Sequence, residues 1–203
     1  MAAVKDVLVN AAGIVKRSYQ AGTTVVNKID GSPLTQADTE VNNYLKDNLL
    51  DLLPEAGWLS EETTDNLDRL GRDWVWVVDP IDGTQDFVQG NPEFAISVGL
   101  VFRQQALLGA VINPASGEGG LGAVGGHVEF WGGLKQKSST TKLSDACAIL
   151  SRTESNDGSV LPFIHLVGSS YPVGSVAYKL LRVAAGHDHL TFSAQHKSEW
   201  DIC

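Results

Sequence analysis

Apolar residues recur at helical spacing in two segments of the N-terminal half of the chain. In the first segment, the apolar positions are Val4, Leu8, Ala11 and Val15. In the second, they are Val41, Leu45, Leu49 and Leu52. Because side chains three or four residues apart share one face of a helix, both patterns predict amphipathic helices. The first helix should end near Gly22, and the second should begin at the N-cap Thr35 and end before Pro54.

Apolar runs rich in β-branched and aromatic residues predict strands in the rest of the chain. The run 74–78 predicts a buried central strand, which Pro80 should end because proline has no N–H to donate to a sheet. Further strands are expected at 25–26, 58–60, 94–102, 106–112, 121–125, 127–131, 146–151 and 190–192, and helices at 84–87 and 176–184. The glycine-rich segment 117–126 should be a turn between strands. Helices and strands in this mixed order predict an α+β fold of stacked layers, and not a doubly wound parallel sheet.

Length and composition describe an ordinary globular protein. The chain has 203 residues, of which 43% are hydrophobic and 19% charged, so it can bury a sizeable core. Its formal net charge of −9 argues against nucleic acid or an anionic membrane surface as its main partner. The two cysteines, Cys147 and Cys203, fit no zinc spacing. Because neither a signal peptide nor a membrane-spanning run is evident, we expect a protein in a reduced, cytoplasmic setting. We also expect it to be a monomer or a homodimer.

Two acidic residues flank a tight turn directly after the apolar run 74–78. Asp79 and Asp82 are three residues apart and can aim at one point, and Gly83 permits a positive φ or a close approach of the backbone. Thr84 can begin a helix whose free N–H groups favour an anion such as phosphate. Two carboxylates, an exposed carbonyl and this helix start together predict a site for a cation and a phosphate group.

Three other interpretations each account for part of this turn. An Asp-Gly turn that only caps a helix explains Asp82 and Gly83, but not Asp79 directly after a buried run. Phosphatases of the haloacid dehalogenase type also place two aspartates after an apolar strand, but two residues apart, whereas here they are three apart. A calcium loop needs Asp or Asn at alternate positions along a longer acidic ladder, which is absent from this sequence.

Residues 79–84 read Asp-Pro-Ile-Asp-Gly-Thr, and this hexapeptide resembles the signature of the inositol monophosphatase superfamily of Mg²⁺-dependent phosphatases. Segments similar to the superfamily also occur in the expected order at 32–38, 59–62 and 200–201. The resemblance implies a layered α/β sandwich of the inositol monophosphatase and fructose-1,6-bisphosphatase type. It also implies two or three Mg²⁺ ions as the cofactor, and oxygen ligands without a His or Cys cluster suit such a hard cation.

The resemblance assigns roles to single residues. As metal ligands it implies Glu61, Asp79, Asp82, Asp201 and the carbonyl of Ile81. Asp38 and Thr84 inherit a catalytic pair, in which the threonine hydroxyl donates to the aspartate and the pair orients the attacking water. Gly83 and Thr84 should hold the phosphoryl oxygens through their N–H groups. Lys28 stands where the nucleotidase branch often has a lysine near the phosphate, so it is a candidate substrate-binding residue.

These roles imply hydrolysis of a phosphate monoester by a water that the metal ions activate. Segments such as 151–153 and 198–201 are similar to the 3′(2′),5′-bisphosphate nucleotidase branch, which implies a small phosphorylated substrate, adenosine 3′,5′-bisphosphate, converted to AMP. Inositol-1-monophosphatase is the alternative. The nucleotidase branch tends to have a Tyr-Pro-Arg-like segment before the last ligand, and residues 191–193 of this sequence read Thr-Phe-Ser instead. An inactive metal-binding nucleotide sensor is a third hypothesis. With no arginine between Leu190 and Asp201, Lys197 is the expected partner of the second phosphate.

The chain is expected to divide into two parts around this site. Residues 1–145 should form an α+β part that carries most of the metal ligands, and residues 146–203 a smaller α/β part that supplies Asp201. Members of the superfamily usually continue past the Trp-Asp pair with a helix and strands, whereas this sequence stops two residues later. We therefore expect either a tail beyond this sequence or a weakly anchored Asp201.

Overall fold

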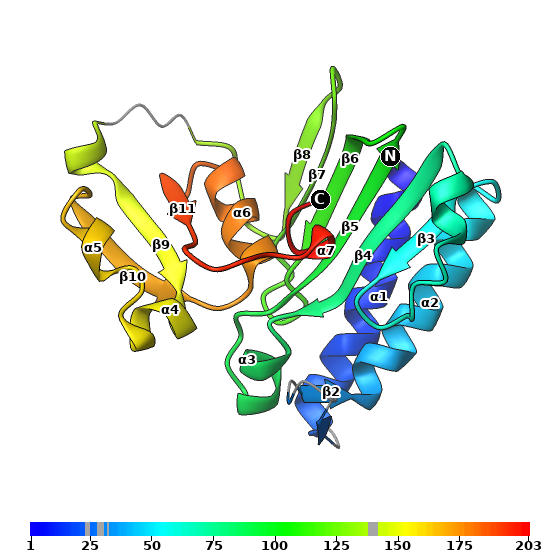
Figure 1. The fold of residues 1–203 in the computed structure, drawn as a ribbon, viewed down its shortest axis with the longest axis horizontal. Coiled ribbons are helices and arrows are strands. Elements are labelled where there is room, and N and C mark those ends of the chain that lie inside the picture. Colours follow the sequence, from blue (N-terminus) through cyan, green and yellow to red (C-terminus); the bar gives the residue numbers. More distant parts are fainter. Residues whose placement is uncertain (23–24, 28–30, 32, 138–141) are drawn as a thin grey trace.

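Two sheets of unequal size, flanked by helices, make up the protein in the computed structural model, which describes residues 1–22, 25–27, 31, 33–137 and 142–203 (Figure 1). The larger sheet has the strand order β3 (Gly57–Ser60), β4 (Trp74–Asp82), β5 (Ala95–Phe102), β6 (Gln105–Ile112), β7 (Gly119–Ala123) and β8 (Val128–Trp131). The smaller sheet has the order β10 (Ser169–Val173), β9 (Cys147–Ser151) and β11 (Leu190–Phe192). A separate ribbon pairs β1 (Val25–Asn27) with β2 (Pro33–Thr35). The predicted α+β fold of stacked layers is therefore confirmed.

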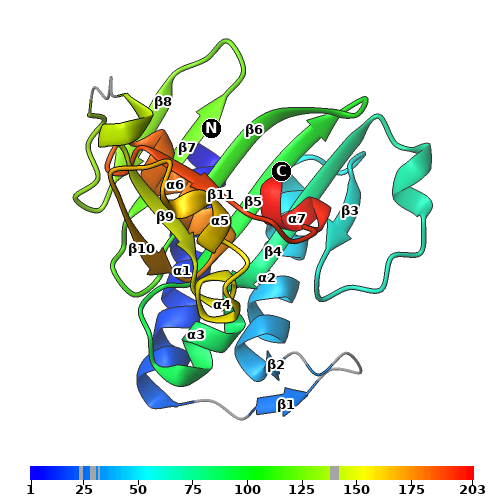
Figure 2. The same cartoon turned by 60° about the vertical axis from the view of Figure 1, so that its left-hand side comes forward.

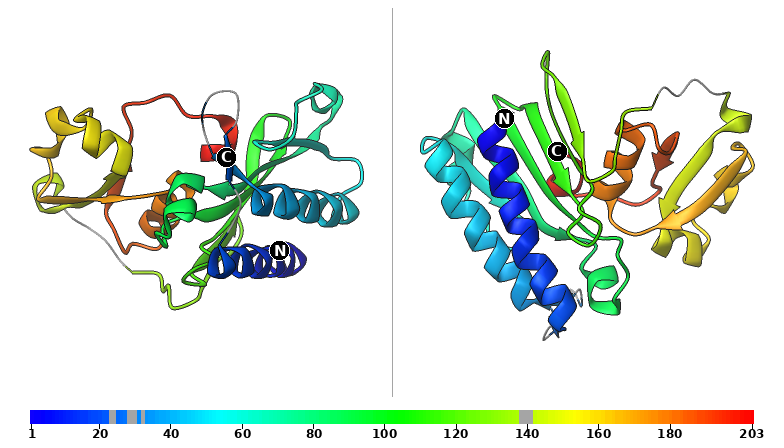
Figure 3. Two further views of the ribbon diagram at one scale, coloured as in Figure 1. Left: turned by 90° about the horizontal axis from the view of Figure 1, so that it is seen from below. Right: turned by 180° about the vertical axis from the view of Figure 1, so that it is seen from behind.

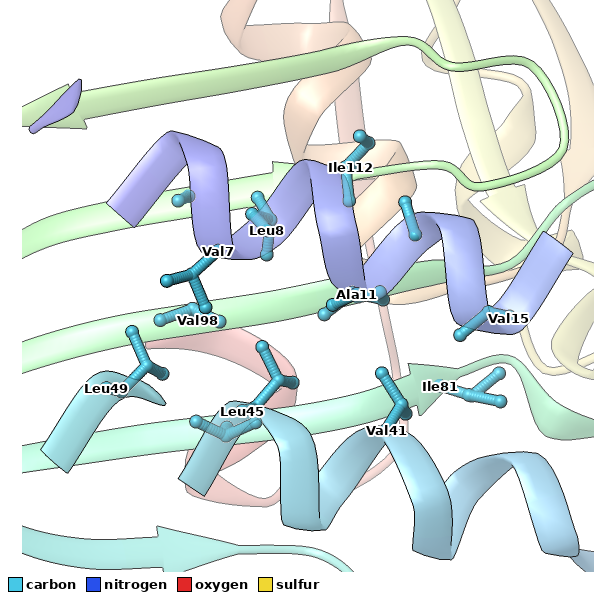
Figure 4. Packing of buried hydrophobic residues seen from close by; sticks show 14 of the residues in the cluster. Val7, Leu8, Ala11, Val15, Val41, Leu45, Leu49, Ile81, Val98 and Ile112 are labelled. Carbon is cyan, nitrogen blue, oxygen red and sulfur yellow. The ribbon is translucent and has the colours of Figure 1, made fainter. Parts of the chain in front are cut away.

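Two long helices, α1 (Ala2–Ala21) and α2 (Gln36–Leu52), cover one face of the larger sheet, as the view from behind shows (Figure 3). Their apolar faces pack against each other and against β4 and β6. Figure 4 shows this core, in which the fully buried side chains include Leu8, Val15, Val41, Leu45 and Leu49. Both helices thus form where the apolar spacing predicted them, because packing of these faces on the sheet stabilises them.

The central strand β4 extends further than the sequence predicted. It is parallel to β3 and antiparallel to β5, and its pairing with β5 shifts register between Asp79 and Asp82. Over this shift β4 has two residues, Pro80 and Ile81, opposite the single residue Ile96 of β5. The expectation that Pro80 ends the strand is wrong, because the proline lies in this bulge, where ladder hydrogen bonds are interrupted.

The glycine-rich segment is part of the sheet, so the expectation that it forms a turn is also wrong. Gly119 and Gly120 lie in β7, which pairs with β6 and β8. A Cβ atom on Gly119 would lie 2.3 Å from the ring of Trp131, and one on Gly120 would lie 2.7 Å from Leu181 Cδ1. Glycine is needed here because neighbouring side chains occupy the space of its missing Cβ.

The remaining helices lie on the other side of the larger sheet, beside the smaller sheet or, for the helix that follows β4, next to β2 (Figure 2). They are α3 (Thr84–Gln89), α4 (Arg152–Asp157), α5 (Leu161–Ile164), α6 (Val176–Ala184) and α7 (Glu199–Ile202), with 3₁₀ turns at Asp68–Gly71 and Leu143–Asp145. Strand β10 and helices α4, α5 and α7 were not predicted. No helix within the described ranges has the length and apolar character needed to span a bilayer.

The C-terminal segment joins the two sheets. The smaller sheet contains only residues after 146, but α6 contacts β5 and β6, and α7 packs against β4 and β5. The end of the chain therefore returns to the central strand of the larger sheet, where the candidate site lies. The division into parts 1–145 and 146–203 stays a prediction.

Candidate active site

Three aspartates from distant parts of the sequence meet at the bulged end of β4. One carboxylate oxygen each of Asp79, Asp82 and Asp201 lie within 4.8 Å of one another. Asp79 and Asp82 are buried, and Asp201, on α7, is half-buried. Ser198 N donates to Asp201 Oδ2 at 2.8 Å and so fixes this carboxylate at the start of α7.

The pKa values of the two buried aspartates indicate a site that needs a cation. Burial raises the pKa of Asp79 well above its usual value, and the charges of Asp82 and Glu61 raise it further. Glu61, which follows β3, therefore faces the same point. Burial also raises the pKa of Asp82, to about 6, although hydrogen bonds from Ser175 and Ala177 oppose the shift. Several oxygen ligands in a buried, self-repelling cluster suit a hard divalent cation such as Mg²⁺.

Asp38 and Thr84 lie next to this cluster. The Thr84 hydroxyl lies 3.4 Å from Oδ1 of Asp38 and 2.9 Å from the carbonyl oxygen of Ile81. The other oxygen of Asp38, Oδ2, accepts hydrogen bonds from the N–H of Thr35 at 2.8 Å and from its hydroxyl at 2.6 Å. Asp38 therefore belongs to a capping box at the start of α2 and also faces Thr84, so the structural and the site interpretations hold together.

Gly83 takes the left-handed conformation that the sequence suggested, with φ +90°. It lies at the N-cap of α3, so the helix begins at Thr84. A Cβ atom on Gly83 would lie 3.1 Å from the carbonyl oxygen of Glu93 and 3.3 Å from Ser175. Glycine at this position therefore allows both the positive φ and the close approach of the turn that carries Ser175.

The sequence analysis did not identify Ser175, which holds one oxygen of Asp82. Its hydroxyl donates to Asp82 Oδ2 at 2.6 Å, and the N–H of Ala177 donates to the same oxygen at 2.6 Å. Ser175 also accepts from Tyr178 N at 3.0 Å and so caps α6. A serine just before the helical pattern 176–184 is an N-cap signal, but nothing local in the sequence indicates that it contacts Asp82.

Of the two lysines predicted to bind substrate, the structure describes only Lys197. Lys28 lies outside the described residues. Lys197 lies beside the aspartate cluster and not in it, where it lines a cavity of about 180 Å³ together with Lys179 and Glu154. Val176 and Ile202 also line this cavity, and each is adjacent in sequence to a residue of the site. The cavity is therefore near the cluster, although none of the three aspartates lines it.

The fold and the site together define a class of protein. Members of this class are α+β sandwiches with an acidic cluster at the end of the central strand. The chain belongs to the inositol monophosphatase family, which it matches over residues 1–203. This membership confirms the family that the hexapeptide 79–84 indicated.

Proteins similar in sequence include members of both candidate branches. Bifunctional phosphatase IMPL2, chloroplastic, of Arabidopsis thaliana is 31% identical over 146 residues, covering 71% of this chain and 42% of that protein. The 3′(2′),5′-bisphosphate nucleotidase CysQ of Escherichia coli K12 is 36% identical over 110 residues, covering 52% of this chain and 44% of that protein. Inositol monophosphatase 3 of Solanum lycopersicum is 28% identical over 212 residues, covering 97% and 79%. The chain thus spans less than half the length of the first two relatives.

Among solved structures, the extragenic suppressor protein suhB from Bartonella henselae has the same fold. It superposes with a TM-score of 0.82 at 23% identity, covering 100% of this chain and 80% of that chain. Together with the family match, this likeness confirms the layered sandwich expected for the inositol monophosphatase family.

Proposed function

We propose that the protein is a Mg²⁺-dependent phosphomonoesterase that acts at the aspartate cluster. The observation that carries this proposal is the convergence of Asp79, Asp82 and Asp201 within 4.8 Å, two of them buried and with raised pKa values. These residues, with Glu61 and the carbonyl of Ile81, are the proposed ligands of two or three ions. When bound, Mg²⁺ lowers the pKa of water and stabilises charge on the phosphoryl and leaving oxygens.

Asp38 and Thr84 are the proposed catalytic pair. Oδ2 of Asp38 is held by two hydrogen bonds from Thr35, so its Oδ1 stays directed at the Thr84 hydroxyl. In the structure the shorter contact of this hydroxyl is its donation to the carbonyl oxygen of Ile81, at 2.9 Å. When it donates its one hydrogen to Asp38 instead, its lone pairs are free to accept a hydrogen bond from the attacking water. Asp38 is then the proton acceptor of the pair, and Thr84 fixes the direction of attack.

The turn between β4 and α3 is the proposed cradle for the transferred phosphoryl group. The positive φ of Gly83 turns the backbone there, and the N–H groups of Gly83 and Thr84 hold the phosphoryl oxygens. Because these donors belong to the backbone, Thr84→Ala removes the hydroxyl and keeps the N–H, whereas any side chain at Gly83 would disturb the turn that presents both donors.

Adenosine 3′,5′-bisphosphate is the proposed substrate, with hydrolysis of its 3′-phosphate giving AMP. The cavity lined by Lys179 and Lys197 supports this choice, because it offers two lysines and because Lys179 is close enough to Asp82 to feel its charge. Burial lowers the pKa of Lys179, the charge of Asp82 opposes this shift, and the charge of Lys197 adds to it, so a second phosphate between the two lysines would relieve their mutual repulsion. The match to the CysQ nucleotidase points the same way.

Inositol-1-monophosphatase activity is the second candidate, because the relative named inositol monophosphatase 3 matches 97% of this chain. Release of phosphate from a panel of esters separates the two. We expect the catalytic efficiency for adenosine 3′,5′-bisphosphate to exceed that for inositol 1-phosphate at least about tenfold, or roughly 1.4 kcal/mol of transition-state binding. Equal or reversed efficiencies would favour the second candidate.

A reducing, cytoplasmic location belongs to the proposal, since Cys147 and Cys203 are both free thiols.

A further inference from the structure

A network of ion pairs and hydrogen bonds, which we call the Arg152 brace, lies beside the aspartate cluster. It consists of the side chains of Arg152, Asp86 and Glu93 and the backbone N–H of Gly174. Nε of Arg152 donates to Oδ1 of Asp86 at 3.2 Å, and its Nη2 donates to Oε2 of Glu93. The same oxygen of Glu93 accepts the N–H of Gly174 at 2.8 Å. Asn91 Nδ2 also donates to Asp86 Oδ1, at 2.9 Å. One guanidinium therefore joins the start of α4 to α3, to the α3–β5 loop and to the β10–α6 turn.

The β10–α6 turn is pressed closely against this network. A Cβ atom on Gly174 would lie 2.2 Å from Oδ2 of Asp86 and 2.6 Å from the carbonyl oxygen of Glu93. Because there is no room for a side chain, the position of the turn depends on where Asp86 and Glu93 lie. Without Arg152, these two carboxylates would face each other and the turn without a shared counter-charge.

The next residue, Ser175, carries backbone strain. It is not a glycine, yet its φ is +55°. Such a conformation is unfavourable for a residue with a side chain and persists only where the surroundings impose it. The strained turn directs the Ser175 hydroxyl at Oδ2 of Asp82, 2.6 Å away. Ser175 therefore connects Gly174 of the brace to a carboxylate of the cluster.

We propose that Arg152 is a positioning residue for the metal centre. By pairing with Asp86 and Glu93 together, it fixes the turn at Gly174, holds Ser175 in its strained conformation and thereby orients the carboxylate of Asp82. The planar fork of arginine can bind two carboxylates in a fixed geometry, which lysine cannot do. The inference rests on the proposed function only in that the aspartate cluster binds a divalent cation.

Partial exposure separates this role from a merely structural one. The Arg152 side chain is 36% exposed and that of Glu93 27%, whereas Asp86 is 11% exposed. Solvent screens the pairs on the arginine side, so they add only modestly to the stability of the fold. Loss of the brace should therefore change the affinity of the cluster for metal far more than it changes the melting temperature. Groups that orient metal ligands typically alter metal affinity or activity by roughly 10- to 100-fold.

The test is Mn²⁺ binding to the whole protein without substrate, measured from the electron paramagnetic resonance signal of free Mn²⁺. Arg152→Met should weaken binding roughly tenfold, as should Ser175→Ala, which removes the direct contact to Asp82. Arg152→Lys, which keeps the charge but not the fork, should give an intermediate loss. Arg103→Met is the matched control, because Arg103 pairs at 2.9 Å with Asp73 on an exposed surface, and it should leave binding unchanged.

Mn²⁺ binding by Arg152→Met at the wild-type affinity, with Ser175→Ala weakened, would overturn the inference. If Arg152→Met does not fold, Arg152→Lys and Glu93→Gln decide in the same way, since each weakens the brace while keeping most of its volume. The proposed function fails separately: a wild-type protein that hydrolyses no ester, with the Mn²⁺ losses as expected, contradicts the activity and supports the positioning role. A wild-type protein that binds no Mn²⁺ overturns both.

Discussion

The hydroxyl of Thr84 lies 3.4 Å from Oδ1 of Asp38, although 46 positions separate the two residues in the sequence. Both side chains are buried, and each stands at the start of a helix. The capping box of α2 holds Asp38, and the left-handed turn at Gly83 holds Thr84, so the contact needs both local structures to form. Two ordinary helix starts thereby place a carboxylate next to a hydroxyl at the edge of the acidic cluster.

Thr84→Ala should lower kcat about a hundredfold with little change in KM, because it removes the group that orients the attacking water. Thr84→Ser, which keeps a hydroxyl, should retain most of the activity. Steady-state kinetics at saturating Mg²⁺ on the two variants measures the difference. A rise in KM at an unchanged kcat would make Thr84 a phosphate-binding residue instead.

Asp82→Asn and Glu61→Gln should each reduce turnover at least about a hundredfold, because each removes a charged ligand of the proposed metal centre. Asp73→Asn is the control, since this exposed carboxylate pairs only with Arg103 among the described residues and should leave turnover unchanged. Circular dichroism should show intact folds for all three variants. A variant that keeps near-normal turnover at saturating Mg²⁺ identifies a residue that is not a ligand.

The metal-free protein should become less stable as the pH rises from about 4 to above 6. Burial raises the pKa of Asp82 from 3.8 to about 6 in the folded protein, so the folded state binds this proton more tightly than the unfolded state. The resulting stabilisation is complete below the unfolded pKa and is lost as the pH rises through the folded one. Between pH 4.5 and 7.5, Asp82 accounts for a loss of about 2 kcal/mol.

Urea denaturation in the presence of a chelator measures this change. The decrease should be smaller in Asp82→Asn, which has no proton to lose, and saturating Mg²⁺ at pH 7.5 should restore the stability of the wild-type protein. The raised pKa of Asp79 acts in the same direction. Identical pH profiles for the wild type and Asp82→Asn would show that Asp82 is not protonated in the metal-free fold.

Features that depend on neighbours in the sequence could be predicted. The apolar spacing of α1 and α2, the capping box of Thr35 and the left-handed glycine at 83 are local, and the structure has each of them. The meeting of Asp79 and Asp82 also followed from their spacing around one turn. Asp201, by contrast, was assigned only through the family resemblance, because nothing local relates position 201 to the end of β4.

Features that depend on tertiary contacts could not be predicted. Gly119 lies in a strand because the ring of Trp131 fills the space beside it, and no turn is involved. Pro80 remains within β4 because a bulge accommodates its missing N–H. The contact of Ser175 with Asp82 depends on an unusual φ that packing around Gly174 imposes. In each case a residue typical of turns serves a purpose set by a partner far away in the sequence.

Lys197→Ala should lower the catalytic efficiency for adenosine 3′,5′-bisphosphate at least about tenfold, and that for 3′-AMP by less than about twofold. The reason is that only the bisphosphate places a second phosphate in the cavity that Lys197 lines with Lys179. Lys179 is a poorer probe, because its ammonium also donates to the carbonyl of Ser175 at 3.0 Å. Lys16→Ala, on the exposed side of α1, is the control. Equal losses on both esters would remove the second-phosphate site from the cavity.

The most direct measurement of the metal-dependent phosphatase activity is phosphate release by the purified protein before and after exhaustive chelation, with adenosine 3′,5′-bisphosphate as the ester. Turnover should require Mg²⁺, disappear on chelation and return when Mg²⁺ is added back. The melting temperature should fall only modestly on chelation, because among the described residues Ile81, at the end of β4, is the one proposed ligand that belongs to the core between α1, α2 and the larger sheet. Turnover that continues unchanged after exhaustive chelation would contradict the account.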